Sequence, residues 1–155
     1  MGIKDDSINL SVFQDQPYLK DAYDKLDDKY KDIDVLIVNA QPITEALAFD
    51  KDVFIGVARN LAKKYKVVTT EKVDAITSTR DDNLKLQDIG AIATKAKYII
   101  GMHTGPLMAC YSKQSKEYVK KWFIVAARQF YYTEIPHEFY LSSNDLKDVE
   151  AKIII

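Results

Sequence analysis

The strongest constraint on the fold is a set of short, largely apolar runs in which hydrophobic and polar residues do not alternate. Residues 33–38 are rich in β-branched side chains, and residues 98–100 and 122–127 are apolar throughout. Continuous runs of this length are typical of strands that are buried on both faces, as in parallel sheets covered by helices. The chain is therefore expected to build its core around such strands.

Segments with apolar residues at helical spacing separate these runs and complete the pattern. The helices are expected at residues 17–31, 52–65, 83–96, from Pro106 onward, at 115–120 and from Ser143 or Asn144 towards Ile153. Further strands are expected at residues 66–70, 75–77, 130–132 and 137–141. Aromatic residues are frequent between residues 122 and 140. They are expected either to form a strand core with a hydrophobic edge or to form a surface that binds a partner.

Strands that alternate with helices of about 10 to 15 residues predict βαβ units. The expected fold class is α/β, with an open, mainly parallel Rossmann-like sheet and helices on both of its faces. Residues 1–16 are polar without a clear period and are expected to form an arm or linker. Residues 17–155 are expected to form a single domain, which suits a chain of 155 residues.

Charge, cysteine content and the length of the apolar runs exclude some binding partners and some cellular locations. The formal net charge is −1, so no basic field favours nucleic acid or an anionic membrane. Cys110 is the only cysteine and lies in an apolar run, so we expect a buried thiol and no intrachain disulfide. No apolar run approaches the roughly 20 residues that span a bilayer, and the first residues lack the apolar core of a signal peptide. We therefore expect a cytoplasmic protein without a membrane span.

Several common cofactor motifs are missing from the sequence. No G-x-G-x-x-G follows the first expected strand, and no P-loop motif occurs among the five glycines. His103 and His137 are far apart, and neither has a cysteine or carboxylate at a recognisable ligand spacing. Neither a bound metal nor a resident cofactor is therefore expected.

The most informative loop follows the strand at residues 98–100. Gly101 ends that strand, and Gly105 with Pro106 permits a tight turn into a new helix. Between them lie His103 and Thr104, next to a helix N-terminus whose amide groups and dipole favour an anion. In open parallel sheets, ligands bind outside the carboxyl ends of the strands. This loop is therefore the expected binding site for an anionic ligand.

Two other loops reach the same edge of the expected sheet. Residues 39–44 follow the first strand, and residues 77–83 follow the strand at 75–77. The candidate ligand-binding residues are Asn39, Gln41, Thr44, Arg80, His103, Thr104, Gly105 and Pro106. Each has a structural alternative: turn chemistry for Asn39, a surface pair of Arg80 with Asp81 or Asp82, and a purely structural hydrogen bond for His103.

Residues 83–110 resemble the donor-side segment of GT-B glycosyltransferases and are most similar to the heptosyltransferase-like group. In that family a Thr-Gly-Pro turn after a hydrophobic strand lies against the diphosphate of a sugar nucleotide, which implies this role for Thr104, Gly105 and Pro106. The family usually has an acid or amide where His103 stands, and commonly a histidine where Met108 stands. A separate N-terminal domain, for which this chain has no room, normally binds the acceptor and supplies the catalytic base.

The resemblance implies the nucleotide-sugar-binding half of a glycosyltransferase. Its substrate would be a nucleoside diphosphate sugar, and turnover would need an acceptor-binding domain or subunit as partner. Two alternatives stay open. One is a non-catalytic interaction module that uses its aromatic C-terminal surface. The other is a small nucleotide- or nucleoside-processing enzyme with His103 or Glu45 as the catalyst.

Overall fold

A six-stranded parallel sheet organises the computed structural model, which describes residues 12–41, 49–126 and 134–153. The strand order is β3-β2-β1-β4-β5-β6, and each neighbouring pair is parallel. The strands are β1 (Val35–Val38), β2 (Val67–Thr69), β3 (Thr77–Ser78), β4 (Tyr98–Met102), β5 (Lys121–Val125) and β6 (His137–Tyr140). The expected α/β class with an open Rossmann-like sheet is confirmed.

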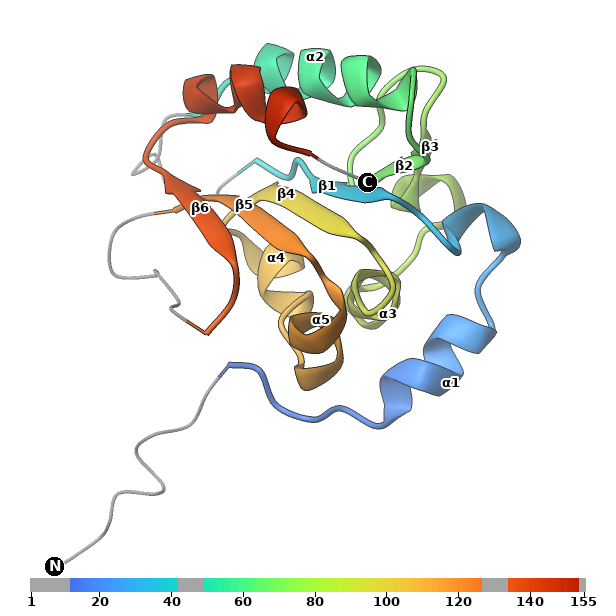
Figure 1. Ribbon diagram of the computed structural model, residues 1–155. Helices are drawn as coiled ribbons and strands as arrows, with labels where there is room; N and C mark the ends of the chain where they lie inside the picture. Colours follow the sequence, from blue (N-terminus) through green and yellow to red (C-terminus); the bar gives the residue numbers. More distant parts are fainter. Residues whose placement is uncertain (1–11, 42–48, 127–133, 154–155) are drawn as a thin grey trace, which may run out of the picture.

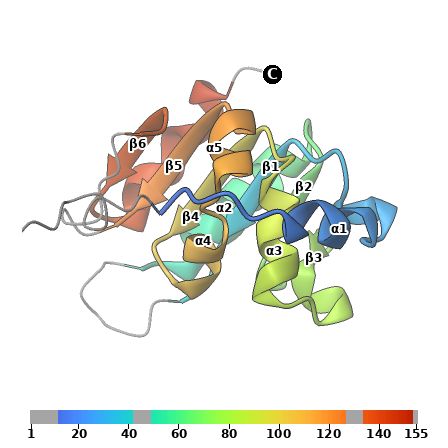
Figure 2. The same cartoon turned by 90° about the horizontal axis from the view of Figure 1, so that it is seen from below.

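Helices cover both faces of this sheet (Figure 1). The α-helices are α1 (Tyr18–Asp24), α2 (Lys51–Ala62), α3 (Leu86–Ala93), α4 (Gly105–Ala109) and α5 (Lys113–Tyr118). The 3₁₀ helices are η2 (Asp28–Tyr30), η3 (Thr79–Asp82) and η5 (Ser143–Lys152). Helices α2 and η5 lie on one face, and α1, α3, α4 and α5 lie on the other, which Figure 2 shows from below.

The central strands contribute side chains to two separate cores, one on each face. Leu36 and Val38 of β1 pack with the helices α1, α3 and α4, whereas Val35 and Ile37 pack beneath α2 and η5. All four side chains are fully buried. This double burial explains the continuous apolar runs, because no residue of such a strand faces water.

The first helix is shorter than its hydrophobic pattern predicts. Helix α1 ends at Asp24, and the chain restarts as η2, where the Asp27 side chain accepts a hydrogen bond from the amide of Lys29 at 3.0 Å. Tyr30 is buried, and its hydroxyl oxygen lies 3.1 Å from the Ser78 carbonyl oxygen and 2.7 Å from a carboxylate oxygen of Asp82. The hydroxyl can donate its proton to either acceptor. A long-range polar anchor therefore takes the place of the last helical turns.

The segment before α1 is packed against the domain. Phe13 is buried, and its ring meets the rings of Tyr111 and Trp122 edge-on at centroid distances of 5.2 and 6.2 Å. Gln16 donates its side-chain amide to the carbonyl of Tyr111 at 3.2 Å. This stretch of the expected arm thus contributes an aromatic side chain to the core.

A charged cluster joins β5, β6 and η5. The Glu138 carboxylate accepts hydrogen bonds from Lys121 at 2.7 Å, from Lys152 at 2.6 Å and from the Tyr140 hydroxyl at 2.9 Å. The lysines Lys121 and Lys152 are the main reason that the pKa of Glu138 falls from 4.5 to about 2. Because the favoured form is the charged one, this cluster stabilises the fold wherever the carboxylate is ionised.

We predict that Glu138→Gln lowers the free energy of unfolding by about 1 kcal/mol at neutral pH, a modest value because the cluster is partly solvated. The carboxylate's contribution is present above its unfolded pKa and is lost as the pH falls through the folded pKa, from about 4.5 towards about 2. Urea unfolding, followed by the fluorescence of Trp122 across this pH range, should therefore give a flatter pH dependence for the variant. The control is Glu117→Gln, which removes an exposed pair with Lys113 at 3.5 Å. Equal pH profiles for the wild type and Glu138→Gln would contradict the prediction.

Candidate functional site

The strand order places a topological switch point between β1 and β4. The chain leaves β1 for α2 on one face of the sheet, and it leaves β4 for α4 on the opposite face. In doubly wound sheets the crevice at such a point, outside the carboxyl ends of the strands, is where ligands bind. The loops after β1 and β4 are therefore the candidate ligand-binding loops.

Gly101 allows β1 and β4 to approach closely at this point. A Cβ atom on Gly101 would lie 2.7 Å from the Val38 Cβ and 3.0 Å from the Val38 carbonyl oxygen. The same atom would lie 3.3 Å from the Leu107 side chain. The glycine at the end of the predicted strand therefore serves close packing at the base of the candidate site.

The expected order of strand, loop and helix is present, but β4 continues through Gly101 to Met102 and α4 begins at Gly105. The amide of His103 donates to the Val125 carbonyl at 2.9 Å, which extends the contact between β4 and β5. Thr104 occupies the N-cap position of α4, but its hydroxyl donates back to the Met102 carbonyl at 3.3 Å instead of capping the helix. Gly105 has open space around it, and Pro106 lies in the first turn. The hydroxyl of Thr104 thus sits beside the start of a new helix.

The imidazole of His103 is half-buried near the ring of Tyr111, with 6.3 Å between the ring centroids. Burial lowers the pKa of His103 below 6.5, because removal of water penalises the imidazolium. The side chain is therefore mainly neutral at pH 7. An anion bound beside it would favour the charged form and raise this pKa.

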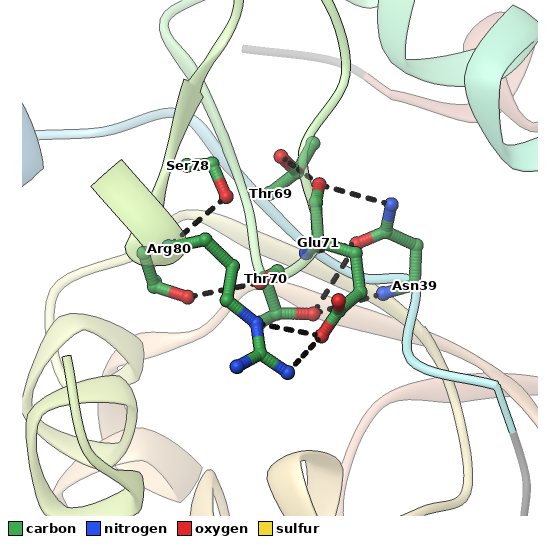
Figure 3. A network of polar contacts seen from close by, with 7 residues as sticks. Asn39, Thr69, Thr70, Glu71, Ser78 and Arg80 are labelled. Carbon is green, nitrogen blue, oxygen red and sulfur yellow. Dashed lines mark hydrogen bonds and ion pairs between the residues drawn. The ribbon is translucent and has the colours of Figure 1, made fainter. Parts of the chain in front are cut away.

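Asn39 joins the carboxyl ends of β1 and β2 (Figure 3). Its side-chain oxygen accepts from the Glu71 amide at 2.9 Å and from the Thr70 hydroxyl at 3.2 Å. Its side-chain nitrogen donates to the Glu71 carbonyl at 3.3 Å, and its own amide donates to the Thr70 hydroxyl at 3.2 Å. Asn39 therefore shapes the edge of the site, with one N–H of its side chain left for a ligand.

Arg80 pairs with Glu71, which corrects the expected alternative of a pair with Asp81 or Asp82. Its Nε and Nη2 atoms lie 3.2 and 2.9 Å from one carboxylate oxygen of Glu71 (Figure 3). Asp81 instead accepts from the amide of Ser78 and pairs with Lys72, and Asp82 pairs with Lys29. The Arg80 side chain stays 60% exposed, and its Nη1 donors make no hydrogen bond within the described residues.

Two adjoining pockets form what we call the carboxyl-edge cleft. The larger, of about 530 Å³, is lined by Gln41, Phe49, Asp50, Lys51, Ser143 and Asn144. The smaller, of about 230 Å³, is lined by Asn39, Gln41, Phe49, Lys51, Ile55, Glu71 and Lys72. Lys51 belongs to both pockets and makes no ion pair with a carboxylate in the described part of the chain. Its ammonium group therefore lies in the cleft near the carboxylate of Asp50, which lines the larger pocket with it.

The structure brings only some of the predicted residues together. Asn39 and Gln41 line the cleft, and Arg80 reaches it through Glu71. The four residues 103–106 lie at the end of β4 and are not among the lining residues of either pocket. Thr44 and Glu45 fall outside the described residues.

Sequence reasoning missed Glu71, Lys51 and Lys72. Glu71 lies two residues after the end of β2, and Lys51 begins α2, whose N-cap Asp50 precedes the expected helix start at residue 52. The position of Glu71 after a predicted strand was a usable signal. Lys51 had no such signal, because nothing in its local sequence distinguishes it from the other surface lysines.

We predict that Gly101→Ala lowers the free energy of unfolding by about 1–3 kcal/mol, because the new methyl group overlaps Val38. Gly56→Ala in α2 is the matched control, since a Cβ there meets no atom within 4 Å. This control should stabilise the helix by about 0.5–1 kcal/mol. Chemical denaturation of both variants measures the contrast, and equal effects of the two substitutions would contradict the close approach of β1 and β4.

Comparisons with family models, with curated proteins and with solved structures found no match to this chain. Within residues 12–41, 49–126 and 134–153, no helix is long and apolar enough to cross a membrane. The same residues contain no group of three or more histidine, cysteine or acidic side chains that could hold a metal ion.

Proposed function

We propose that this chain is the nucleotide-sugar-binding half of a glycosyltransferase, with the diphosphate of a nucleoside diphosphate sugar held at the Gly101–Pro106 loop. The observation that carries the proposal is the position of this loop. It leaves β4 directly beside β1, at the switch point of a parallel sheet with the order β3-β2-β1-β4-β5-β6. This is the position at which open α/β sheets of the same strand order bind nucleotides.

The polar groups around the switch point suit a diphosphate. Thr104 presents a hydroxyl beside the start of α4, and His103 gains a proton more readily when an anion is near. Lys51 supplies an ammonium group from the other side of the switch point, and Arg80 keeps exposed donors beyond its pair with Glu71. The proposed role of these groups is electrostatic: they would stabilise the leaving diphosphate as the glycosidic bond to it breaks.

The proposal needs a partner for turnover. A second domain or subunit would bind the acceptor and supply the base that removes its proton, because the proposed groups of this chain act on the donor. The nucleoside diphosphate sugar is a substrate in this scheme, so no resident cofactor is part of it.

The structure gives little support to the alternative of an interaction module, because the described aromatic residues that suggested it are buried or partly buried. Trp122 and Phe123 are fully buried in the two cores, and Phe139 and Tyr140 are partly buried against the same cores. These four side chains serve the interior of the fold. Phe130, Tyr131 and Tyr132 fall outside the described residues.

Calorimetric titration with UDP, GDP, ADP and CMP tests the proposal. We expect saturable binding of one nucleoside diphosphate, with an affinity about tenfold weaker in Thr104→Val and in Arg80→Ala, since each loses a hydrogen bond to phosphate. Thr104→Ser keeps the hydroxyl and should bind like the wild type. Arg59→Ala, on the exposed surface of α2, is the control for loss of an arginine.

Two results would contradict the proposal. One is the absence of saturable binding of all four nucleotides at millimolar concentration. The other is binding that Thr104→Val and Arg80→Ala leave unchanged, because the ligand would then lie away from the Gly101–Pro106 loop.

A further inference from the structure

A third pocket, of about 510 Å³, lies between α1, the end of α3 and α5. Thr94 and Lys95 precede β4, and Tyr118 precedes β5, so this pocket lies at the amino ends of the strands. Figure 2 shows the three helices on the face of the sheet away from α2. We call this pocket the amino-edge groove, and it is separate from the carboxyl-edge cleft.

The amino-edge groove combines an apolar floor with aromatic walls. Leu19 is a core residue that reaches the groove from α1 and keeps only 1% of its surface exposed. Tyr23 and Tyr118 line the groove from α1 and α5, and Tyr118 is 43% exposed. A volume of this size falls within the range of roughly 300–1,000 Å³ that is usual for small-molecule sites.

The hydroxyls of Tyr23 and Tyr118, which line the groove, donate no hydrogen bond within the described residues. The Tyr23 hydroxyl accepts from the Asp32 amide at 3.1 Å, and its own proton has no acceptor among the contacts of the described residues. Burial, together with the proximity of Tyr118 and acidic groups, raises the pKa of Tyr23, so this hydroxyl keeps its proton. The Tyr118 hydroxyl likewise makes no hydrogen bond within the described part of the chain. Both phenols are therefore available to an acceptor.

Four charged side chains line the groove, two cations and two carboxylates, and one of the cations lacks a carboxylate partner among the described residues. Lys20 pairs with Asp24 at 2.9 Å, and Glu117 pairs with Lys113 at 3.5 Å. Lys95 pairs with no carboxylate among the residues that the structure describes, and its Nζ lies 5.1 Å from the centroid of the Tyr118 ring. Lys95 therefore offers a ligand carboxylate an ammonium group next to an aromatic surface.

We propose that the amino-edge groove binds a small amphiphilic monocarboxylate. Its apolar ring packs between Tyr23 and Tyr118, and its carboxylate accepts hydrogen bonds from Lys95 and from a phenol. This site is independent of the proposed donor site at the opposite edge of the sheet.

Binding of 1-naphthaleneacetate, followed by heteronuclear NMR of the full chain, tests this inference. Saturable shifts should centre on the amides of Leu19, Lys95 and Tyr118. The neutral 2-(1-naphthyl)ethanol has the same ring and should bind about tenfold more weakly, since it lacks the charge that Lys95 complements. Lys95→Gln should weaken the carboxylate by about the same factor and leave the alcohol unchanged. Lys120→Gln, an exposed lysine outside the groove, is the matched control.

Three outcomes would overturn the proposal. The first is the absence of saturable shifts in the groove at millimolar carboxylate. The second is equal affinity of the acid and the alcohol, or an affinity that Lys95→Gln does not change, which would remove the role of the charge. The third is a shift of the groove amides with protein concentration alone, which would assign the groove to a second copy of the chain.

Discussion

The pairing of β1 with β4 is the contact on which the rest of the structure depends. These two strands are joined in register from Val35 opposite Tyr98 to Val38 opposite Gly101. Their side chains fill the cores on both faces, so the helices on either side pack against the same pair of strands. Because the chain turns to opposite faces after β1 and after β4, this pairing also creates the switch point. Core packing and the position of the candidate site therefore have one origin.

Polar contacts at the rim of the sheet add to the packing of the apolar strands by joining loops and helices to it. Asn39 and Thr70 hold the ends of β1 and β2 together, and Tyr30 anchors the segment after α1 to η3. Glu138 joins the opposite edge to η5 through two lysines. The contacts of Asn39 and of Tyr30 with Ser78 are buried, so they satisfy polar groups that water does not reach. The loops at the carboxyl edge consequently start from fixed positions.

The sequence predicted the elements whose signal is local. Continuous apolar runs predicted β1, β4 and β5, because a strand buried on both faces tolerates few polar residues. Contacts between distant residues were not predictable in this way. The early end of α1 depends on the hydrogen bonds of Tyr30 to Ser78 and Asp82, and the partner of Arg80 is Glu71 on a neighbouring loop. Lys51 gained its place in the cleft only from the packing of α2 beside η5.

The most direct measurement is a map of where a nucleotide binds. An isotope-labelled sample of the full chain would be titrated with whichever nucleoside diphosphate binds most tightly, and the amide shifts would be followed residue by residue. We expect saturable shifts at His103–Leu107 and at Lys51, together with a rise in the pKa of His103 in the bound state. Shifts centred instead on Leu19 and Lys95 at the amino edge, or an unchanged pKa of His103, would contradict a nucleotide site at the switch point.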